Sequence, residues 1–182
     1  MKTYCIQSIL SKPEALIVFQ GNIDRLVKYF VLNEDNGSFL QFSRLVGVAQ
    51  KKLSKKDLKT CDYLEGIVGI PIFSSRFINV FSHILNDDVD FYPIEIQCGE
   101  VVQEFYLAKI KNYMNLINYE ESGFRTLRDG SKILSHPIII HNSLDDFLIA
   151  RDEQSKSVWV VSESFRKIVE EAGLKMKFNE TL

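Results

Sequence analysis

The chain has 182 residues, of which 46% are hydrophobic and 25% are charged. This balance excludes a disordered chain, and the formal net charge of -2 argues against a nucleic-acid-binding protein, which normally carries a basic face. The length predicts a single domain over residues 1–182, with 13 Phe, 7 Tyr and 1 Trp supplying much of its core.

Cysteine usage and the N-terminal sequence indicate a cellular compartment. Cys5, Cys61 and Cys98 are far apart in the sequence and form no CxxC pair, which is typical of reduced thiols in the cytosol. The first ten residues contain no apolar stretch of signal-peptide length, and no run approaches the roughly 18 apolar residues of a membrane span. We therefore expect a cytoplasmic protein without a membrane partner.

Residues 23–32 are the ambiguous part of the N-terminal third. Their apolar residues fit a helix capped by Asn22, and residues 29–32 fit a strand equally well. We favour extended structure, because Asp35-Asn36-Gly37 is typical of a hairpin turn, with residues 39–42 as the returning strand.

Clearer elements flank this stretch. Strands are predicted at residues 4–10 and 15–19, and Ser54 with Asp57 three residues later resembles a capping box for a helix over residues 55–61. Lysines concentrate on and before this helix without aromatic residues to stack on bases, so they indicate a solvated helix face: Lys51, Lys52, Lys55, Lys56 and Lys59.

The middle of the chain predicts a strand, a buried helix and a pair of strands. Residues 70–73 form the strand, and Ser74-Ser75 can cap a helix with a broad apolar face over residues 77–85. Two paired strands follow at residues 91–97 and 104–110.

Short strands and one irregular segment are predicted after residue 110. The irregular segment is residues 124–135, with a turn at Asp129-Gly130. The strands are predicted at residues 114–118, 137–141, 147–151 and 158–161.

The C-terminal segment gives the plainest local signals. Ser162 can cap a helix with an apolar face, and Gly173 can end it in the left-handed conformation. Residues 174–178 alternate apolar and lysine residues, as a one-sided strand does. Taken together, the elements predict an α+β fold with a largely antiparallel sheet and a few packed helices.

The search for catalytic chemistry gives weak candidates. The chain has no GxGxxG, Walker, HExxH or calcium-loop motif. His141, Ser143 and Asp145 have the side-chain types of a hydrolase triad, but triad members normally come from separate elements. The residues therefore single out no catalytic, cofactor-binding or metal-binding set, and we keep a hydrolase built around His141 as an alternative.

Carboxylates gather in three predicted turns. Paired carboxylates can serve acid–base or metal chemistry, bind a basic protein, or simply solvate a turn. Solvation is the simplest reading of any single pair, whereas the set would suit recognition of a basic protein. The residues are Asp87, Asp88 and Asp90, then Glu120 and Glu121, then Asp145 and Asp146.

The chain from about residue 62 to residue 178 resembles a known family. The features that carry the resemblance are Asp62-Tyr63, the segments 71–77, 91–94, 105–107 and 115–119, and the closing segments 147–151, 159–165 and 170–174. On these the chain resembles bacterial immunity proteins from polymorphic toxin systems, namely immunity family eleven, first described as a domain of unknown function, and the similar family forty-three. Residues 1–60 are not placed by the resemblance.

The resemblance implies a non-enzymatic protein that binds and neutralises a cognate toxin, encoded by an adjacent gene, and so protects the producing cell and its siblings. A structural or regulatory binding module unrelated to toxins is the other alternative, and the oligomeric state is open. We expect loops to recognise the toxin, because the side chains of the scaffold are used for packing. We predict a toxin-contacting set of acidic turn residues and exposed aromatics: Asp87, Asp88, Asp90, Tyr92, Tyr119, Asp145 and Asp146.

Overall fold

Six strands form a closed barrel in the computed structural model, which describes residues 2–10, 15–140 and 146–181. Around the barrel the order is β2-β3-β6-β7-β5-β4, and neighbours are antiparallel except β2 with β4 and β3 with β6. Closure pairs each strand on both sides and so removes exposed edges. The strands are β2 (Leu16–Phe19), β3 (Val46–Ala49), β4 (Tyr63–Gly66), β5 (Ile72–Ser74), β6 (Val89–Cys98) and β7 (Val101–Ile110).

Two glycines let large side chains fill this small barrel. A Cβ at Gly47 would lie 2.5 Å from Ile17 and 2.9 Å from Ile96, and a Cβ at Gly66 would lie 2.9 Å from Phe19. Real side chains do not approach so closely, so a residue without a Cβ is needed at both places.

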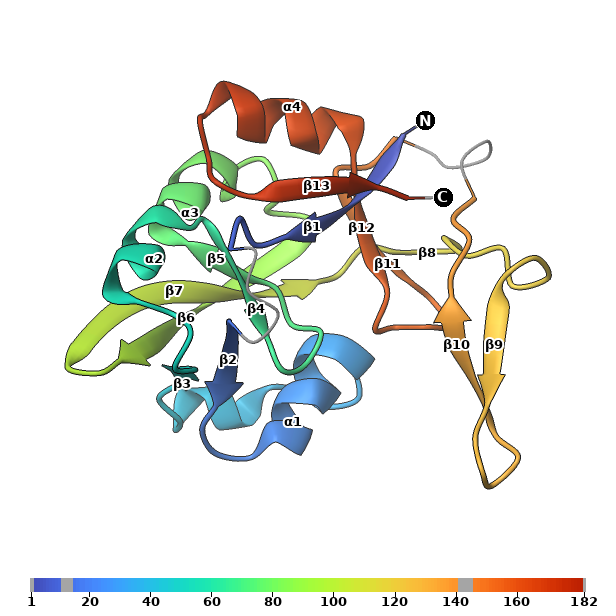
Figure 1. Cartoon of the computed structure of the whole chain (residues 1–182), viewed down its shortest axis with the longest axis horizontal. Helices are drawn as coiled ribbons and strands as arrows, with labels where there is room; N and C mark the ends of the chain where they lie inside the picture. Colours follow the sequence, from blue (N-terminus) through green and yellow to red (C-terminus); the bar gives the residue numbers. More distant parts are fainter. Residues whose placement is uncertain (1, 11–14, 141–145, 182) are drawn as a thin grey trace.

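A second sheet lies beside the barrel, with the order β13-β1-β12-β11-β8 (Figure 1). The first and last strands of the chain are neighbours in it, and only β11 with β8 is parallel. The sheet meets the barrel where β1 contacts β4 and β11 contacts β7. Its strands are β1 (Thr3–Gln7), β8 (Tyr113–Met114), β11 (Ile149–Asp152), β12 (Trp159–Ser162) and β13 (Lys177–Glu180).

Three helices begin at the predicted caps. The Ser54 hydroxyl accepts from the Asp57 backbone N–H, completing a capping box for α2 (Lys55–Thr60). The Ser74 hydroxyl caps α3 (Ser75–Phe81) in the same way, and the Ser162 hydroxyl caps α4 (Glu163–Glu171). Gly173 has a φ of +65°, the left-handed conformation predicted after α4. The α+β prediction is confirmed, with mostly antiparallel sheets and packed helices.

The prediction of extended structure at residues 23–32 and a returning strand at 39–42 is wrong. Residues 23–32 are α1 (Ile23–Val27) running into a π-helical turn, η1 (Lys28–Leu32), and the supposed returning strand is a 3-10 turn, η2 (Ser38–Gln41). The helix prevails because the Asn22 side chain caps it by accepting from the Arg25 N–H and because Phe30 is fully buried against the barrel.

Three predictions after residue 110 also need correction. Residues 124–135 are not irregular but form a hairpin of β9 (Gly123–Thr126) and β10 (Lys132–His136). The strand at 114–118 shrinks to β8, because the backbone N–H groups of Leu116 and Ile117 donate to a buried carboxylate, that of Asp152. The predicted strand at 137–141 reduces to a single bridge between Ile139 and Ile117, and its last residue lies outside the described residues.

A stack of phenylalanines joins α3 and α4 to the barrel. Ring centroids lie 4.0 Å apart between Phe73 and Phe77, 4.3 Å between Phe77 and Phe81, and 4.6 Å between Phe81 and Phe165. All four side chains are almost completely buried. This stack is the centre of the core between the barrel and the second sheet.

Replacement of Phe165 by alanine should lower the free energy of unfolding by about 3–5 kcal/mol, because it leaves a cavity at the end of the aromatic stack. Urea denaturation measures the loss. The matched control is Phe42→Ala, whose side chain is 86% exposed and which should leave the midpoint unchanged. A loss below about 1 kcal/mol for Phe165→Ala would contradict its place in the core.

Candidate partner-binding surface

The predicted acidic turn is shorter than expected, because Val89 and Asp90 already belong to β6, and one lysine partly neutralises its carboxylates. Lys111 Nζ lies 2.8 Å from Asp90 Oδ1 and donates to the Asn86 carbonyl oxygen at 3.2 Å. Asp87 is exposed, whereas Asp88 is half-buried. Burial raises the pKa of Asp88, Asp87 raises it further, and Lys111 opposes both effects. Asp87 is therefore the member of this turn most available to a partner.

Tyr92, on β6, is held in place by other aromatic side chains. Its hydroxyl shares a short hydrogen bond with the Tyr29 hydroxyl, and its ring meets the rings of Tyr29 and Phe30 edge to face. Burial is the main cause that raises the pKa of Tyr92, followed by the hydrogen bond from Tyr29, and Asp90 adds to the rise. Asp90 and Tyr92 are two residues apart on β6, so their side chains lie on the same face of that strand.

A surface groove of about 290 Å³ extends this surface. Its apolar walls include Leu40, Leu45 and Tyr92, and its rim carries an ion pair between Arg44 and Glu95. Phe42, which lies between groove residues in the sequence, is 86% exposed. Exposed aromatic groups beside an apolar groove with a polar rim are typical of protein interfaces.

Tyr119 supports the fold rather than lying free for a partner. Its hydroxyl donates to Asp152 Oδ1 and accepts from the backbone N–H of Ser155. Asp152 is fully buried, and its carboxylate also accepts from the N–H groups of Leu116 and Ile117. Burial and the hydrogen bond to Asp152 raise the pKa of Tyr119. Tyr119 thus locks the turn after β11.

The third predicted acidic turn is only partly described. Asp146 is exposed. Asp145 lies outside the described residues, as do His141 and Ser143, on which the hydrolase alternative rests. The structure therefore gives no geometry for a triad around His141.

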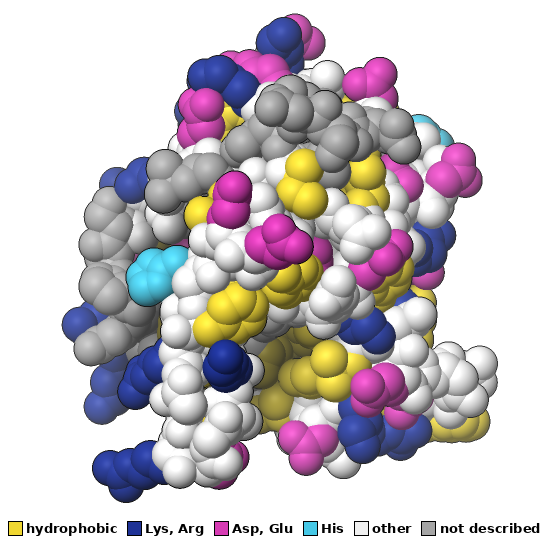
Figure 2. Space-filling view, turned by 90° about the vertical axis from the view of Figure 1, so that its right-hand side faces the viewer, with side chains coloured by type: hydrophobic (Ala, Val, Ile, Leu, Met, Phe, Trp, Pro, Cys, Tyr) yellow, Lys and Arg dark blue, Asp and Glu magenta, His cyan; other side chains and the backbone are white. Residues whose placement is uncertain are grey.

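The predicted contact residues fall into separate places. Tyr92 packs against the barrel core around Phe30, whereas Tyr119 packs against a different cluster around Leu116 and Phe147. Figure 2 shows one face of the molecule, where acidic and basic side chains are interspersed around a hollow with hydrophobic walls. Of the predicted set, the structure brings together the acidic turn and Tyr92 through β6.

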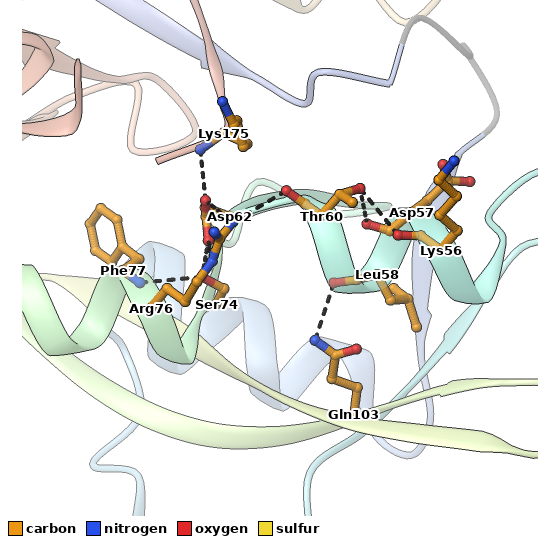
Figure 3. Close-up of polar contacts among 10 residues, drawn as sticks. All are labelled: Lys56, Asp57, Leu58, Thr60, Asp62, Ser74, Arg76, Phe77, Gln103 and Lys175. Carbon is orange, nitrogen blue, oxygen red and sulfur yellow. Dashed lines mark hydrogen bonds and ion pairs between the residues drawn. The ribbon is translucent and has the colours of Figure 1, made fainter. Parts of the chain in front are cut away.

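The carboxylate of Asp62, which the sequence analysis named only as part of the resemblance, joins three parts of the chain (Figure 3). Asp62, just before β4, is fully buried and accepts from Ser74 Oγ at 2.5 Å. Arg76 donates to it from Nε at 3.0 Å and from Nη2 at 2.6 Å, and the Lys175 backbone N–H donates at 2.6 Å. Four donors satisfy the carboxylate, so it acts as a structural clasp.

Arg151, on β11, is a second buried charge that the sequence did not reveal. Its side chain is fully buried, and Nη1 donates to the Lys156 carbonyl oxygen. Nε and Nη2 have no hydrogen-bond partner among the described residues, and neither does the hydroxyl of Tyr113, the register partner of Arg151 on β8. Burial lowers the pKa of Arg151 to about 10, which leaves the guanidinium charged at neutral pH.

Comparisons and simple site searches add little to this geometry. In the described part of the chain, no three His, Cys, Asp or Glu side chains gather as metal ligands would. Among the same residues, no helix is both long and apolar enough to cross a membrane. A scan against protein-family models and a search of curated proteins find no match.

Replacement of Asp62 by asparagine should lower the free energy of unfolding by about 2–4 kcal/mol. The amide keeps one acceptor oxygen but turns an NH2 group toward the donors of Arg76 and Lys175. The loss stays moderate because the Arg76 side chain is 54% exposed and can be hydrated. Urea denaturation measures it.

The control for Asp62→Asn is Glu170→Gln, which removes a carboxylate from a pair with Arg166 on the surface of α4. Its denaturation midpoint should match that of the unaltered chain, because exposed pairs add little to stability. A loss below about 1 kcal/mol for Asp62→Asn would show that the clasp does not stabilise the fold.

Proposed function

We propose that this chain is a non-enzymatic immunity protein that binds and neutralises a cognate toxin in the cytoplasm of the cell that makes both. The proposal rests on one structural observation, the apolar groove beside Tyr92 with the exposed Phe42 next to it. Phe42 is 86% exposed, and covering such a side chain by a partner would contribute hydrophobic free energy to binding.

The groove has the composition of a recognition surface. Leu40, Leu45 and Tyr92 offer apolar area, and Arg44 and Glu95 supply charges of both signs at its rim. Tyr92 is fixed by the Tyr29 hydroxyl and two ring contacts, so little conformational entropy is lost when a partner covers it. A fixed aromatic anchor inside a polar rim is the arrangement of binding hot spots.

The family resemblance supports the same proposal from another side. Asp62, Ser74 and Arg76 lie in the segments on which the resemblance rests, and they meet in one buried clasp. Residues of this kind preserve a scaffold while its surface changes from one partner to another. A scaffold with a variable surface is what an immunity protein needs.

The decisive experiment is co-expression of this chain with the product of the adjacent gene in a host that the product kills. We expect the two proteins to co-purify and the host to grow. Growth without co-purification would favour an indirect or enzymatic effect, to be followed by His141→Ala. Neither growth nor binding would overturn the proposal and leave a binding module unrelated to toxins.

The role of Phe42 beside the groove can be tested directly by mutation. Phe42→Ala should raise the Kd for the toxin about tenfold or more, since truncation of an aromatic anchor typically has this effect. The matched control is Ile67→Ala, because Ile67 is also exposed, at 41%, but belongs neither to the groove nor to the β9–β10 hairpin. Equal affinity of Phe42→Ala and the unaltered chain would remove the groove from the interface.

Charge reversal at the acidic turn tests the predicted electrostatic contact. Asp87→Lys should slow association with the toxin about twofold to tenfold at low salt and leave the melting temperature unchanged, because Asp87 is exposed. The control is Glu171→Lys, which also replaces a carboxylate by a lysine, at the exposed last residue of α4. Stopped-flow mixing measures the rates. An unaltered rate for Asp87→Lys would exclude the turn from the encounter surface.

A further inference from the structure

The β9–β10 hairpin stands away from the rest of the molecule (Figure 1). Its two strands pair with each other and with no other strand of the described chain. Residues 124–133 are exposed without interruption, although they are ordered as a regular ribbon. An isolated two-stranded ribbon is marginal in water, so this one needs local support.

The support comes from the tip and the root of the hairpin. At the tip, Asp129 Oδ1 accepts from the N–H of Ser131 at 3.0 Å and from its hydroxyl at 2.6 Å, and Gly130 has a φ of +85°. At the root, the Ser122 hydroxyl donates to the Asn118 carbonyl at 2.6 Å and accepts from the Ile138 N–H at 2.9 Å. The arm is therefore built before any partner arrives.

Three apolar side chains of this arm are exposed. Phe124 is 46% exposed, Leu127 is 38% exposed and Ile133 is 44% exposed. Arg125 and Ile133 are register partners, and Leu127 is two residues beyond Arg125, so these three side chains share one face of the ribbon. Leu127 and Ile133 are therefore partly open to solvent on the same face.

The arm is also positively charged in a chain of net charge -2. The arm carries three cations, Arg125, Arg128 and Lys132, and one carboxylate, Asp129. That carboxylate accepts two hydrogen bonds from Ser131. None of the three cations forms an ion pair with a described residue. Their charges are therefore free to meet carboxylates of a partner.

We propose that the β9–β10 hairpin is a preformed docking arm that places Leu127 and Ile133 in an apolar depression of the cognate toxin, with its three cations against carboxylates at the rim of that depression. This inference rests on the proposed function. It adds a second contact region to the groove beside Tyr92 and states the chemistry of the surface that receives the arm.

A protein partner fits the arm better than a nucleic acid does. A two-stranded ribbon that binds duplex DNA enters a groove with polar and basic side chains, whereas the face with Arg125 also presents the aliphatic side chains of Leu127 and Ile133. The single aromatic residue of the arm, Phe124, pairs with Leu134 on the opposite face. Aliphatic side chains stabilise a complex mainly when the partner removes them from water.

Two variants of the full chain separate the apolar and the charged parts of the arm. Leu127→Ser with Ile133→Ser should raise the Kd for the toxin about tenfold or more, chiefly through faster dissociation. Arg125→Glu, Arg128→Glu and Lys132→Glu together should slow association about tenfold at low salt, with a smaller effect at high salt. Surface plasmon resonance against the adjacent-gene product, in catalytically inactivated form, measures both.

Matched controls carry the same changes elsewhere. Ile67→Ser with Val102→Ser removes two apolar side chains that are 41% and 54% exposed. Lys51→Glu, Lys55→Glu and Lys56→Glu together reverse three exposed charges near α2. Both controls should bind like the unaltered chain. Melting temperatures of all variants should agree, because every altered side chain is exposed.

The outcomes distinguish this inference from the proposed function. If the unaltered chain binds the toxin and both arm variants bind equally well, the docking arm is wrong and the proposed function stands. If the unaltered chain does not bind, both fail. Binding of a short fluorescent DNA duplex, lost in the charge variant, would also overturn the inference by making the arm a nucleic-acid contact, and so would a dimer of this chain that the serine variant dissociates.

Discussion

The buried carboxylate of Asp62 is the interaction on which the architecture depends. It lies where the barrel, α3 and the C-terminal segment meet, and it accepts from Ser74, Arg76 and the backbone of Lys175. Backbone bonds in both directions reinforce the junction, from Ser74 N–H to the Asp62 carbonyl and from Asp62 N–H to the Lys175 carbonyl. A buried charge is tolerated only when it is satisfied, so all three parts must be in place together.

This junction explains how the phenylalanine stack is assembled. Ser74 both donates to Asp62 and caps α3, so the helix that carries Phe77 and Phe81 starts at a fixed point. The return of the chain through Lys175 places α4, and with it Phe165, over the other end of the stack. Polar geometry thus sets the position, and apolar burial supplies most of the stability.

The interior also limits which residues remain for recognition. The Tyr119 hydroxyl donates a hydrogen bond to Asp152, and Asp90 forms an ion pair with Lys111. The groove flanked by Phe42, the ribbon of residues 124–133 and the carboxylate of Asp87 remain exposed. A rigid scaffold with two preformed contact regions would let an immunity protein bind its toxin at small entropic cost, since neither region has to fold on binding.

The sequence by itself determined the elements with strong local signals, but not the helical turns at residues 23–32 or the hairpin of β9 and β10. Serine caps, the left-handed Gly173 and the apolar pattern of β6 and β7 depend on neighbouring residues, so they could be predicted, as could the α+β class. The barrel closure, the clasp and the exposure of the hairpin were decided by the tertiary structure. Asp62 and Lys175 are 113 positions apart, and whether Leu127 or Tyr92 faces water depends on what packs against it. Such long-range pairings leave no periodic signal in one sequence.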